Sequence, residues 1–154
     1  MPRGGRHRLV AHLLPFCVIR KASGTKMKRL RILIADDETS ARELLRRMLE
    51  REGHSVVTVG SGREAIAAFQ QALREGKAFD LVITDLGMPQ GNGRQVVQMV
   101  KSLAPTTFVA VFSGWDARQG EEWSRWVDYF LPKPLTRYEL QELLRKATTS
   151  LLPR

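Results

Sequence analysis

The 154-residue sequence predicts an open α/β fold, a doubly wound parallel sheet of five strands covered by helices on both faces. First, apolar strand-like runs alternate with amphipathic helical patterns five times after residue 30. Second, the length fits one domain with a substantial core, and no repeat or low-complexity linker divides the chain. Third, 43% hydrophobic and 27% charged residues are ordinary for a globular protein.

The first strand–helix unit runs from the apolar segment LRILIA at 30–35 into a helical pattern over 39–53. Thr39 or Ser40 is the expected N-cap of this helix, and Gly53 is its expected stop. Its apolar face is formed by Leu44, Leu45, Met48 and Leu49.

The next two units repeat this plan. The second pairs a strand at 55–59 with a helix at 61–76. The third pairs a strand at 80–84 with the helical pattern GRQVVQMVKSLAP at 93–105, in which the expected helix stops before Pro105. Because connections between parallel strands are right-handed, few ways of winding such a sheet are possible.

The last two units differ in the strength of their helical patterns. A strand at 107–112 is followed by a weaker helical pattern over 115–125. A strand at 127–131 is followed by a strong pattern over 136–152, with Thr136 as the expected N-cap.

The net charge of +9 and pI of about 10.4 invite a nucleic-acid partner, but the charge is unevenly distributed. Residues 1–31 hold nine of the 25 Lys and Arg residues and no Asp or Glu. The remainder balances sixteen basic against sixteen acidic residues. We therefore expect no nucleic-acid partner for the folded body.

Residues 1–26 are expected to be a disordered basic extension, translated from an early start codon, ahead of a folded domain at 27–152. A targeting peptide or a basic tail for an acidic partner is the alternative. The apolar run at 9–19 is too short to span a bilayer, so no membrane partner is expected. The single cysteine, Cys17, fits a reducing compartment, and we expect a cytoplasmic protein.

Polar side chains follow four of the five predicted strands. Asp36 and Asp37 follow the first, Asp85 the third, Ser113 the fourth and Lys133 the fifth. Each has an ordinary explanation as a cap, a turn or a solvated group. Together, however, they fall at the strand carboxyl ends, where open α/β sheets bind ligands. Clustered carboxylates suit Mg²⁺, and an Asp nucleophile beside a Lys ammonium suits phosphoryl transfer.

Four motifs carry a family resemblance: ADD at 35–37, TDLGMPQGNG at 84–93, FSG at 112–114 and YFLPKP at 129–134. They resemble the receiver domain of two-component response regulators, in particular stand-alone regulators like those of chemotaxis. The resemblance covers about residues 28–150. It implies a flavodoxin-like (βα)5 sheet of order 2-1-3-4-5 and a phosphoacceptor signalling domain rather than an enzyme in the usual sense.

The resemblance implies that Asp85 accepts a phosphoryl group from a sensor histidine kinase or a histidine phosphotransfer protein, and that the domain catalyses both this transfer and the later hydrolysis. Asp37, Asp85 and the carbonyl of Gly87 would bind Mg²⁺, with Asp36 acting mostly through a metal-bound water. Glu38 is interpreted as an acidic residue near a helix start.

Ser113 and Lys133 would contact the phosphoryl oxygens, and the Lys133-Pro134 bond is expected to be cis. Phe130 matches an aromatic switch residue that fills the space freed when Ser113 moves toward the phosphoryl group. Half-buried packing on an edge strand explains the same residue type equally well.

The resemblance places the contact with an unknown downstream protein on the predicted helix at 115–125, the strand at 127–131 and the helix at 136–152. Trp115, Trp123 and Trp126 lie in this region. Core packing is the favoured interpretation of these residues, and an aromatic docking surface is the alternative. We expect a monomer or a weak phosphorylation-dependent dimer.

Two other functions stay open at this point. A haloacid-dehalogenase-like phosphatase also uses Mg²⁺, an Asp and a Lys, but expects a D-x-D motif on the first strand. A phosphorylation-independent interaction module on the same fold would fail to react with a small phosphodonor. The complete set of acidic, hydroxyl and lysine positions argues against that second alternative.

Overall fold

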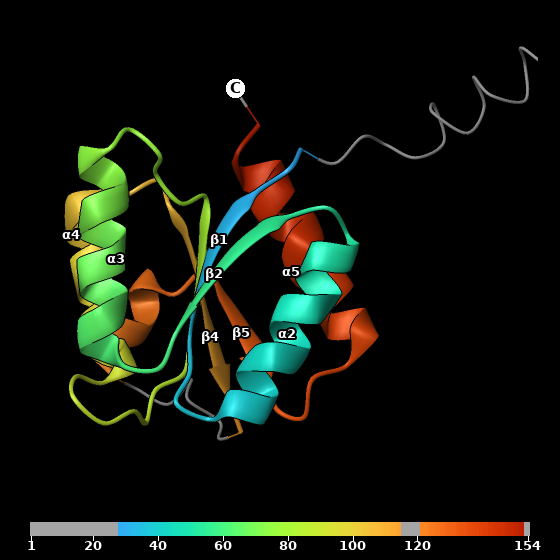
Figure 1. Ribbon diagram of the computed structural model, residues 1–154, viewed down its shortest axis with the longest axis horizontal. Coiled ribbons are helices and arrows are strands. Elements are labelled where there is room, and N and C mark those ends of the chain that lie inside the picture. Colours follow the sequence, from blue (N-terminus) through green and yellow to red (C-terminus); the bar gives the residue numbers. More distant parts are fainter. Residues whose placement is uncertain (1–27, 115–120, 153–154) are drawn as a thin grey trace, which may run out of the picture.

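The computed structural model describes residues 28–114 and 121–152, which form one parallel sheet between two layers of helices (Figure 1). No helix in these two segments is long and apolar enough to cross a membrane. The elements are β1 Arg31–Ala35, α2 Thr39–Arg51, β2 Ser55–Val59, α3 Gly62–Arg74, β3 Leu81–Thr84, α4 Gly93–Leu103, β4 Phe108–Ser113, the 3-10 helix η1 Glu122–Trp126, β5 Tyr129–Pro132 and α5 Arg137–Ser150.

The strand order is β2-β1-β3-β4-β5 with every neighbouring pair parallel, so the predicted fold class is confirmed. Helices α2 and α5 cover one face of the sheet, and α3 and α4 cover the other (Figure 1). Side chains alternate between these faces along β1. Ile32 and Ile34 enter the core under α2 and α5, whereas Leu33 and Ala35 enter the core under α3 and α4.

Most helix ends follow the predicted signals. Thr136 is the N-cap of α5, and its side chain accepts a hydrogen bond from the Glu139 N–H at 3.1 Å. Gly53 follows α2 with φ of +93°, a left-handed conformation that favours glycine.

The predicted cap of α2 is wrong. Its N-cap is Glu38, whose side chain makes no capping bond, and the helix already includes Thr39. The physical reason lies two residues before Glu38. The carboxylate of Asp36 accepts the Glu38 N–H at 2.9 Å and thereby fixes where the helix begins.

The predicted helix at 115–125 is also wrong over its described part, which is the 3-10 helix η1 at Glu122–Trp126. Few residues are available to continue a helix after η1, because the Asp128 N–H is already bonded to the Val109 carbonyl of β4 at 2.8 Å. Trp123 is 6% exposed and packs in the core, as the core-packing interpretation predicts. Trp115 and the extension at 1–26 lie outside the described residues.

Candidate phosphoryl-transfer site

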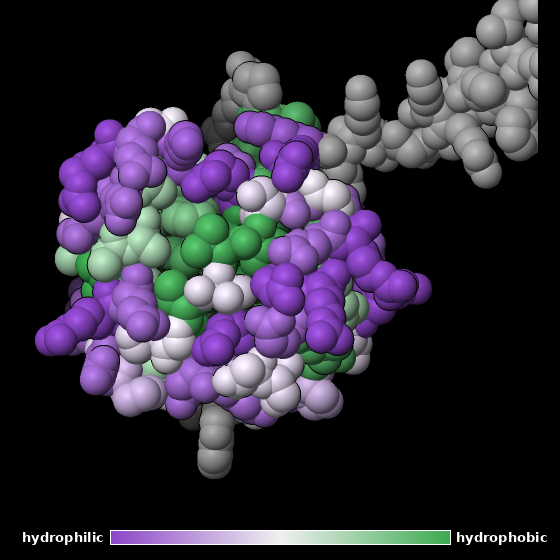
Figure 2. All heavy atoms as spheres, viewed as in Figure 1, coloured by the Kyte–Doolittle hydropathy of each residue, from purple (hydrophilic) through white to green (hydrophobic). Residues whose placement is uncertain are grey.

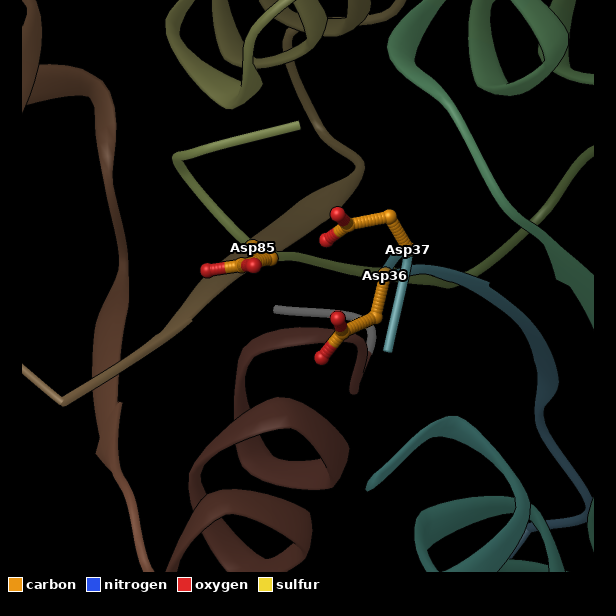
Figure 3. A group of neighbouring side chains, drawn as sticks. All are labelled: Asp36, Asp37 and Asp85. Atoms are coloured by element: carbon orange, nitrogen blue, oxygen red, sulfur yellow. The ribbon is translucent and has the colours of Figure 1, made fainter. Parts of the chain in front are cut away.

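The two acidic motifs meet because β1 and β3 are neighbours in register. Ala35 pairs with Thr84, and the Asp85 N–H bonds to the Ala35 carbonyl at 2.8 Å. The next residue of each strand therefore enters the same edge of the sheet. Carboxylate oxygens of Asp36, Asp37 and Asp85 all lie within 4.8 Å of one another, on the same side of the strand ends (Figure 3).

Asp36 is the most deeply placed of the three carboxylates, with a side chain 1% exposed. Its Oδ1 accepts the Glu38 N–H at 2.9 Å, and its Oδ2 accepts from Lys133 Nζ at 3.0 Å. Arg42 donates to the backbone carbonyl of Asp36 at 2.7 Å. A buried carboxylate needs such partners, and here they also fix its orientation.

Lys133 reaches the same edge from the end of β5, 97 residues after Asp36. Its Nζ lies 3.0 Å from Asp36 Oδ2, 3.6 Å from Asp85 Oδ2 and 3.9 Å from a carboxylate oxygen of Glu38. The ammonium also lies 4.8 Å from the centroid of the Phe112 ring. One cation is thus shared among several carboxylates and paired exclusively with none.

Burial raises the pKa of Asp85, and the neighbouring charges of Asp36 and Asp37 raise it further, whereas Lys133 and the Leu86 N–H oppose this. Burial lowers the pKa of Lys133, but its hydrogen bond to Asp36 and the surrounding negative charge outweigh burial and raise it overall. The lysine is therefore held in its charged form. The site as a whole carries more negative than positive charge.

The structure also places the remaining predicted residues. Ser113 ends β4, is half-buried, and accepts the Lys133 N–H on its carbonyl at 3.1 Å. Gly87 lies two residues after Asp85, is exposed, and has open space where a Cβ would stand. Phe130 is half-buried on the edge strand β5, as the packing interpretation predicts. The Lys133-Pro134 bond is cis, as predicted.

Two features of the site were missed from the sequence. Glu38 contributes to the charge around Lys133 as well as to the helix start, and the run Asp36-Asp37-Glu38 was a signal for this. Gly93 packs directly on the backbone of Asp85, where a Cβ would overlap the Asp85 carbonyl oxygen. Helix α4 can approach the acidic site this closely only because Gly93 has no side chain.

The cluster fits a small hard cation. Oxygens bound to one Mg²⁺ at about 2.1 Å lie at most about 4.2 Å apart, so oxygens within 4.8 Å need only a small rotation or a bridging water. The donors are all carboxylates, the ligand type that Mg²⁺ prefers. Burial first, and the negative charges of Asp36 and Asp37 after it, raise the pKa of Asp85, and a bound cation would favour its ionised form against both.

Comparisons with known proteins agree with this geometry. Residues 32–145 match the model of the response regulator receiver domain. The transcriptional regulatory protein ResD of Bacillus subtilis is 31% identical over 123 residues, 77% of this chain and 49% of ResD. NtrC of Azospirillum brasilense is 31% identical over 131 residues, 82% of this chain and 26% of NtrC. The chain thus spans about half or less of these two relatives.

Solved structures extend the comparison to the fold. The response regulator TrrA of Thermotoga maritima, in complex with Mg²⁺-BeF, is 29% identical with a TM-score of 0.69, covering 77% of this chain and 98% of that one. The chemotaxis regulator CheY4 of Vibrio cholerae is 26% identical with a TM-score of 0.68, covering 78% and 99%. The family match argues against the phosphatase alternative. The chain belongs to the response regulator receiver domain family of two-component signalling.

Proposed function

We propose that this receiver domain accepts a phosphoryl group on Asp85 from a phosphohistidine, with Mg²⁺ bound beside it, and signals by phosphorylation-dependent protein contact. One observation carries the proposal above all others. The Lys133 ammonium lies within 3.6 Å of a carboxylate oxygen of Asp85 and 3.0 Å from one of Asp36. The proposed nucleophile, the lysine cation and the carboxylates proposed to bind the metal therefore share one edge of the sheet.

The chemistry requires one bond to form and one to break. A carboxylate oxygen of Asp85 attacks the phosphorus, and the P–N bond to the donor histidine breaks with its electron pair remaining on the imidazole. Asp85 Oδ1 accepts the Leu86 N–H at 2.8 Å, which holds the carboxylate in place for attack. Lys133 and the Ser113 hydroxyl would receive the negative peripheral oxygens of the transferred group.

Asp37, Asp85 and the carbonyl of Gly87 would hold the Mg²⁺, with Asp36 acting mostly through a metal-bound water. When bound, the ion supplies positive charge against the carboxylates and the phosphoryl oxygens. TrrA, a structural relative, was solved in complex with Mg²⁺-BeF, which supports a magnesium ion in the same kind of site here.

The proposed donor is a sensor histidine kinase or a histidine phosphotransfer protein. A second solved structure with 29% identity and a TM-score of 0.67 is the complex of TrrA with the histidine kinase ThkA. That relative supports a kinase as the partner of this chain. The proposal also includes self-catalysed hydrolysis of the acyl phosphate. It further includes a cytoplasmic location, which suits a chain whose single cysteine can form no disulfide within the chain.

Phosphorylation would be transmitted through β4 and β5. Ser113 and Phe130 lie on these adjacent strands, and Val111 pairs with Phe130 in the register. A shift of Ser113 toward the phosphoryl group would change the packing available to Phe130 and bias the surface of η1, β5 and α5. Trp126 and Tyr138, 36% and 71% exposed, are the large side chains that this surface offers to a partner.

The test is phosphorylation by acetyl phosphate with Mg²⁺, followed by intact mass measurement. We expect one added phosphoryl group on the wild-type chain, none on Asp85→Asn, and none after the metal is removed by a chelator. Asp80→Asn is the matched control, because Asp80 lies at the opposite end of β3, and it should label normally. An unlabelled wild type that binds Mg²⁺ in calorimetry would instead indicate a phosphorylation-independent module.

A further inference from the structure

Strand β2 is an edge strand, and no other strand of the described residues covers its outer side. Its sequence, Ser55 to Val59, reads SVVTV and contains no charged residue and no proline. Val57 is 38% exposed, and Val56 and Val59 are half-buried. Figure 2 shows an apolar surface between α3 and α2, where β2 runs in Figure 1. Exposed apolar edges of this kind are templates for strand pairing.

The backbone of β2 has hydrogen-bonding groups directed away from the sheet. The Ser55 N–H bonds to the Leu30 carbonyl at 2.9 Å, and the Val59 carbonyl accepts the Asp36 N–H at 3.1 Å. In a parallel ladder alternate residues face the neighbour, so Ser55, Val57 and Val59 face β1. Val56 and Thr58 therefore direct their N–H and C=O groups outward, where the part of the chain that the structure describes supplies no strand.

The other edge of the sheet shows the contrast. Strand β5 is four residues long, contains Pro132, and is bounded by the charged residues Asp128 and Lys133. Short length, proline and flanking charge are devices that block edge pairing. Strand β2 is only one residue longer, but it contains no proline and is bounded by His54 and Gly60 instead of an Asp and a Lys, so the two edges of the sheet differ in protection.

We propose that β2 pairs antiparallel with β2 of a second copy of this chain, about a two-fold axis through Val57. In this register Val56 of each copy exchanges both backbone hydrogen bonds with Thr58 of the other. The two Val57 side chains meet as a non-hydrogen-bonded pair, where Cβ atoms are about 4.5–5.5 Å apart. Because the strand has no charge, no like charges meet across it, and the pairing is isologous.

The expected dimer is weak. A five-residue strand extends over only about 17 Å, so this contact falls at or below the roughly 1,200 Å² of total area that stable interfaces bury. Its formation depends on protein concentration and not on phosphorylation, because the pairing groups belong to β2 alone. It therefore goes beyond the proposed phosphoacceptor role and does not rest on it.

The first test is sedimentation equilibrium of the full chain from low micromolar to near-millimolar concentration. We expect reversible dimerisation, and we expect Val57→Lys to raise the dimer dissociation constant at least about tenfold, since it places like charges directly opposite. Leu103→Lys is the matched control: Leu103 is similarly exposed, at 43%, but lies on α4 and should leave the constant unchanged. Circular dichroism checks that both variants fold.

Cysteine cross-linking gives a second measurement that does not depend on charge. In a Cys17→Ser background, Val57→Cys should form a disulfide-linked dimer under mild oxidation, because non-hydrogen-bonded pairs have Cα atoms about 4.5 Å apart, within disulfide range. Leu103→Cys should cross-link at least about tenfold more slowly. A monomer at every concentration, or a dimer that Val57→Lys leaves intact, overturns the proposal. In a separate Val57→Cys chain that keeps Cys17, a disulfide between these two cysteines of one chain, in place of the linked dimer, would also overturn it.

Discussion

The two ends of the sheet use aspartate in opposite ways. At the amino ends, Asp80 accepts the Arg31 N–H and Asp128 accepts the Val109 N–H, each at 2.8 Å from a neighbouring strand. Lys101 adds an ion pair to Asp128 at 2.7 Å. These carboxylates are separated from one another, and each has its own donors.

At the carboxyl ends three carboxylates crowd within 4.8 Å and share the ammonium of Lys133. Burial and neighbouring negative charge raise the pKa of Asp85, so the ionised form of this one carboxyl group opposes folding. Aspartates therefore link neighbouring strands at the amino ends of the sheet, whereas at the carboxyl ends they lie close enough to repel one another. The comparison teaches that the end at which we propose phosphoryl transfer is the one where charge is left incompletely compensated.

The largest difference between the ends should appear when each loses its lysine. Lys133→Ala removes the cation beside Asp85, and we expect phosphorylation by acetyl phosphate to slow by about 10²–10³-fold. Lys101→Ala removes the matched cation at the amino end and should lower stability by about 1 kcal/mol without slowing phosphorylation. Labelling time courses and urea unfolding of both variants measure this. Equal losses of rate would show that the two ends do not differ as we describe.

A second prediction concerns the backbone contact between Gly93 and Asp85 at the carboxyl end of the sheet. Gly93→Ala would place a Cβ on the Asp85 carbonyl oxygen, so α4 and β3 must separate. We expect a loss of about 2–3 kcal/mol in the free energy of unfolding, the range of overpacked cores. Gly87→Ala meets open space and should cost less than about 0.5 kcal/mol. Urea denaturation distinguishes the two, and similar values would mean that the Gly93 contact is not limiting.

A third prediction compares Asp128 with Asp85. Replacing each by Asn should change the free energy of unfolding in opposite directions. Asp128→Asn weakens the bonds to Lys101 and to the Val109 N–H, and should destabilise the fold by about 1–2 kcal/mol. Asp85→Asn relieves repulsion and should stabilise it by about 1 kcal/mol without metal.

The pH dependence of Asp85 has a definite sign. Because its pKa is raised on folding, the folded state binds more protons, and wild-type stability falls as pH rises from the ordinary carboxyl range through the raised value. Asp85→Asn should lack this fall. Added Mg²⁺ should stabilise the wild type selectively and shrink the advantage of the variant. If Asp85→Asn destabilises the metal-free protein, the repulsion is not as we infer.

The sequence predicted what depends on local pattern and strand order. The alternation of apolar runs located β1 to β5 within about two residues, and the strand-end rule brought Asp36, Asp85 and Lys133 together. The resemblance to a known family added the order of the strands and the roles of these residues.

Long-range contacts could not be predicted from pattern. Nothing local indicates that Gly93 must lie on the Asp85 carbonyl, because the reason is the meeting of two elements. The replacement of a helix by η1 likewise follows from Asp128 being bonded to β4, a contact across the sheet. The edge exposure of β2 became visible only once its neighbour on the other side was known.

The smallest predicted effect concerns His54, a buried titratable residue directly before β2 at the amino end of the sheet. His54 is 4% exposed; its Nδ1 accepts the Leu30 N–H at 3.0 Å, and its Nε2 has no hydrogen-bond partner among the described residues. Burial lowers the pKa of His54, with Glu52 opposing and Arg29 reinforcing that shift. In the unfolded chain His54 therefore binds a proton near pH 6.5, whereas in the folded chain it binds one only at lower pH. Stability should fall as pH decreases below about 6.5 and level off below the lowered value.

Between about pH 7.5 and 5.5 we expect this loss to be on the order of 1 kcal/mol or less, measured by urea unfolding in the Asp85→Asn background. That background matters because Asp85, with its raised pKa, changes stability with the opposite sign as the solution is acidified. His54→Asn should remove the loss, since an amide can still accept the Leu30 N–H without titrating. A loss that persists in His54→Asn would assign it to other groups. Removal of the loss would show that each end of the sheet holds a titratable group whose charged form is destabilised by burial, His54 at the amino end and Asp85 at the carboxyl end.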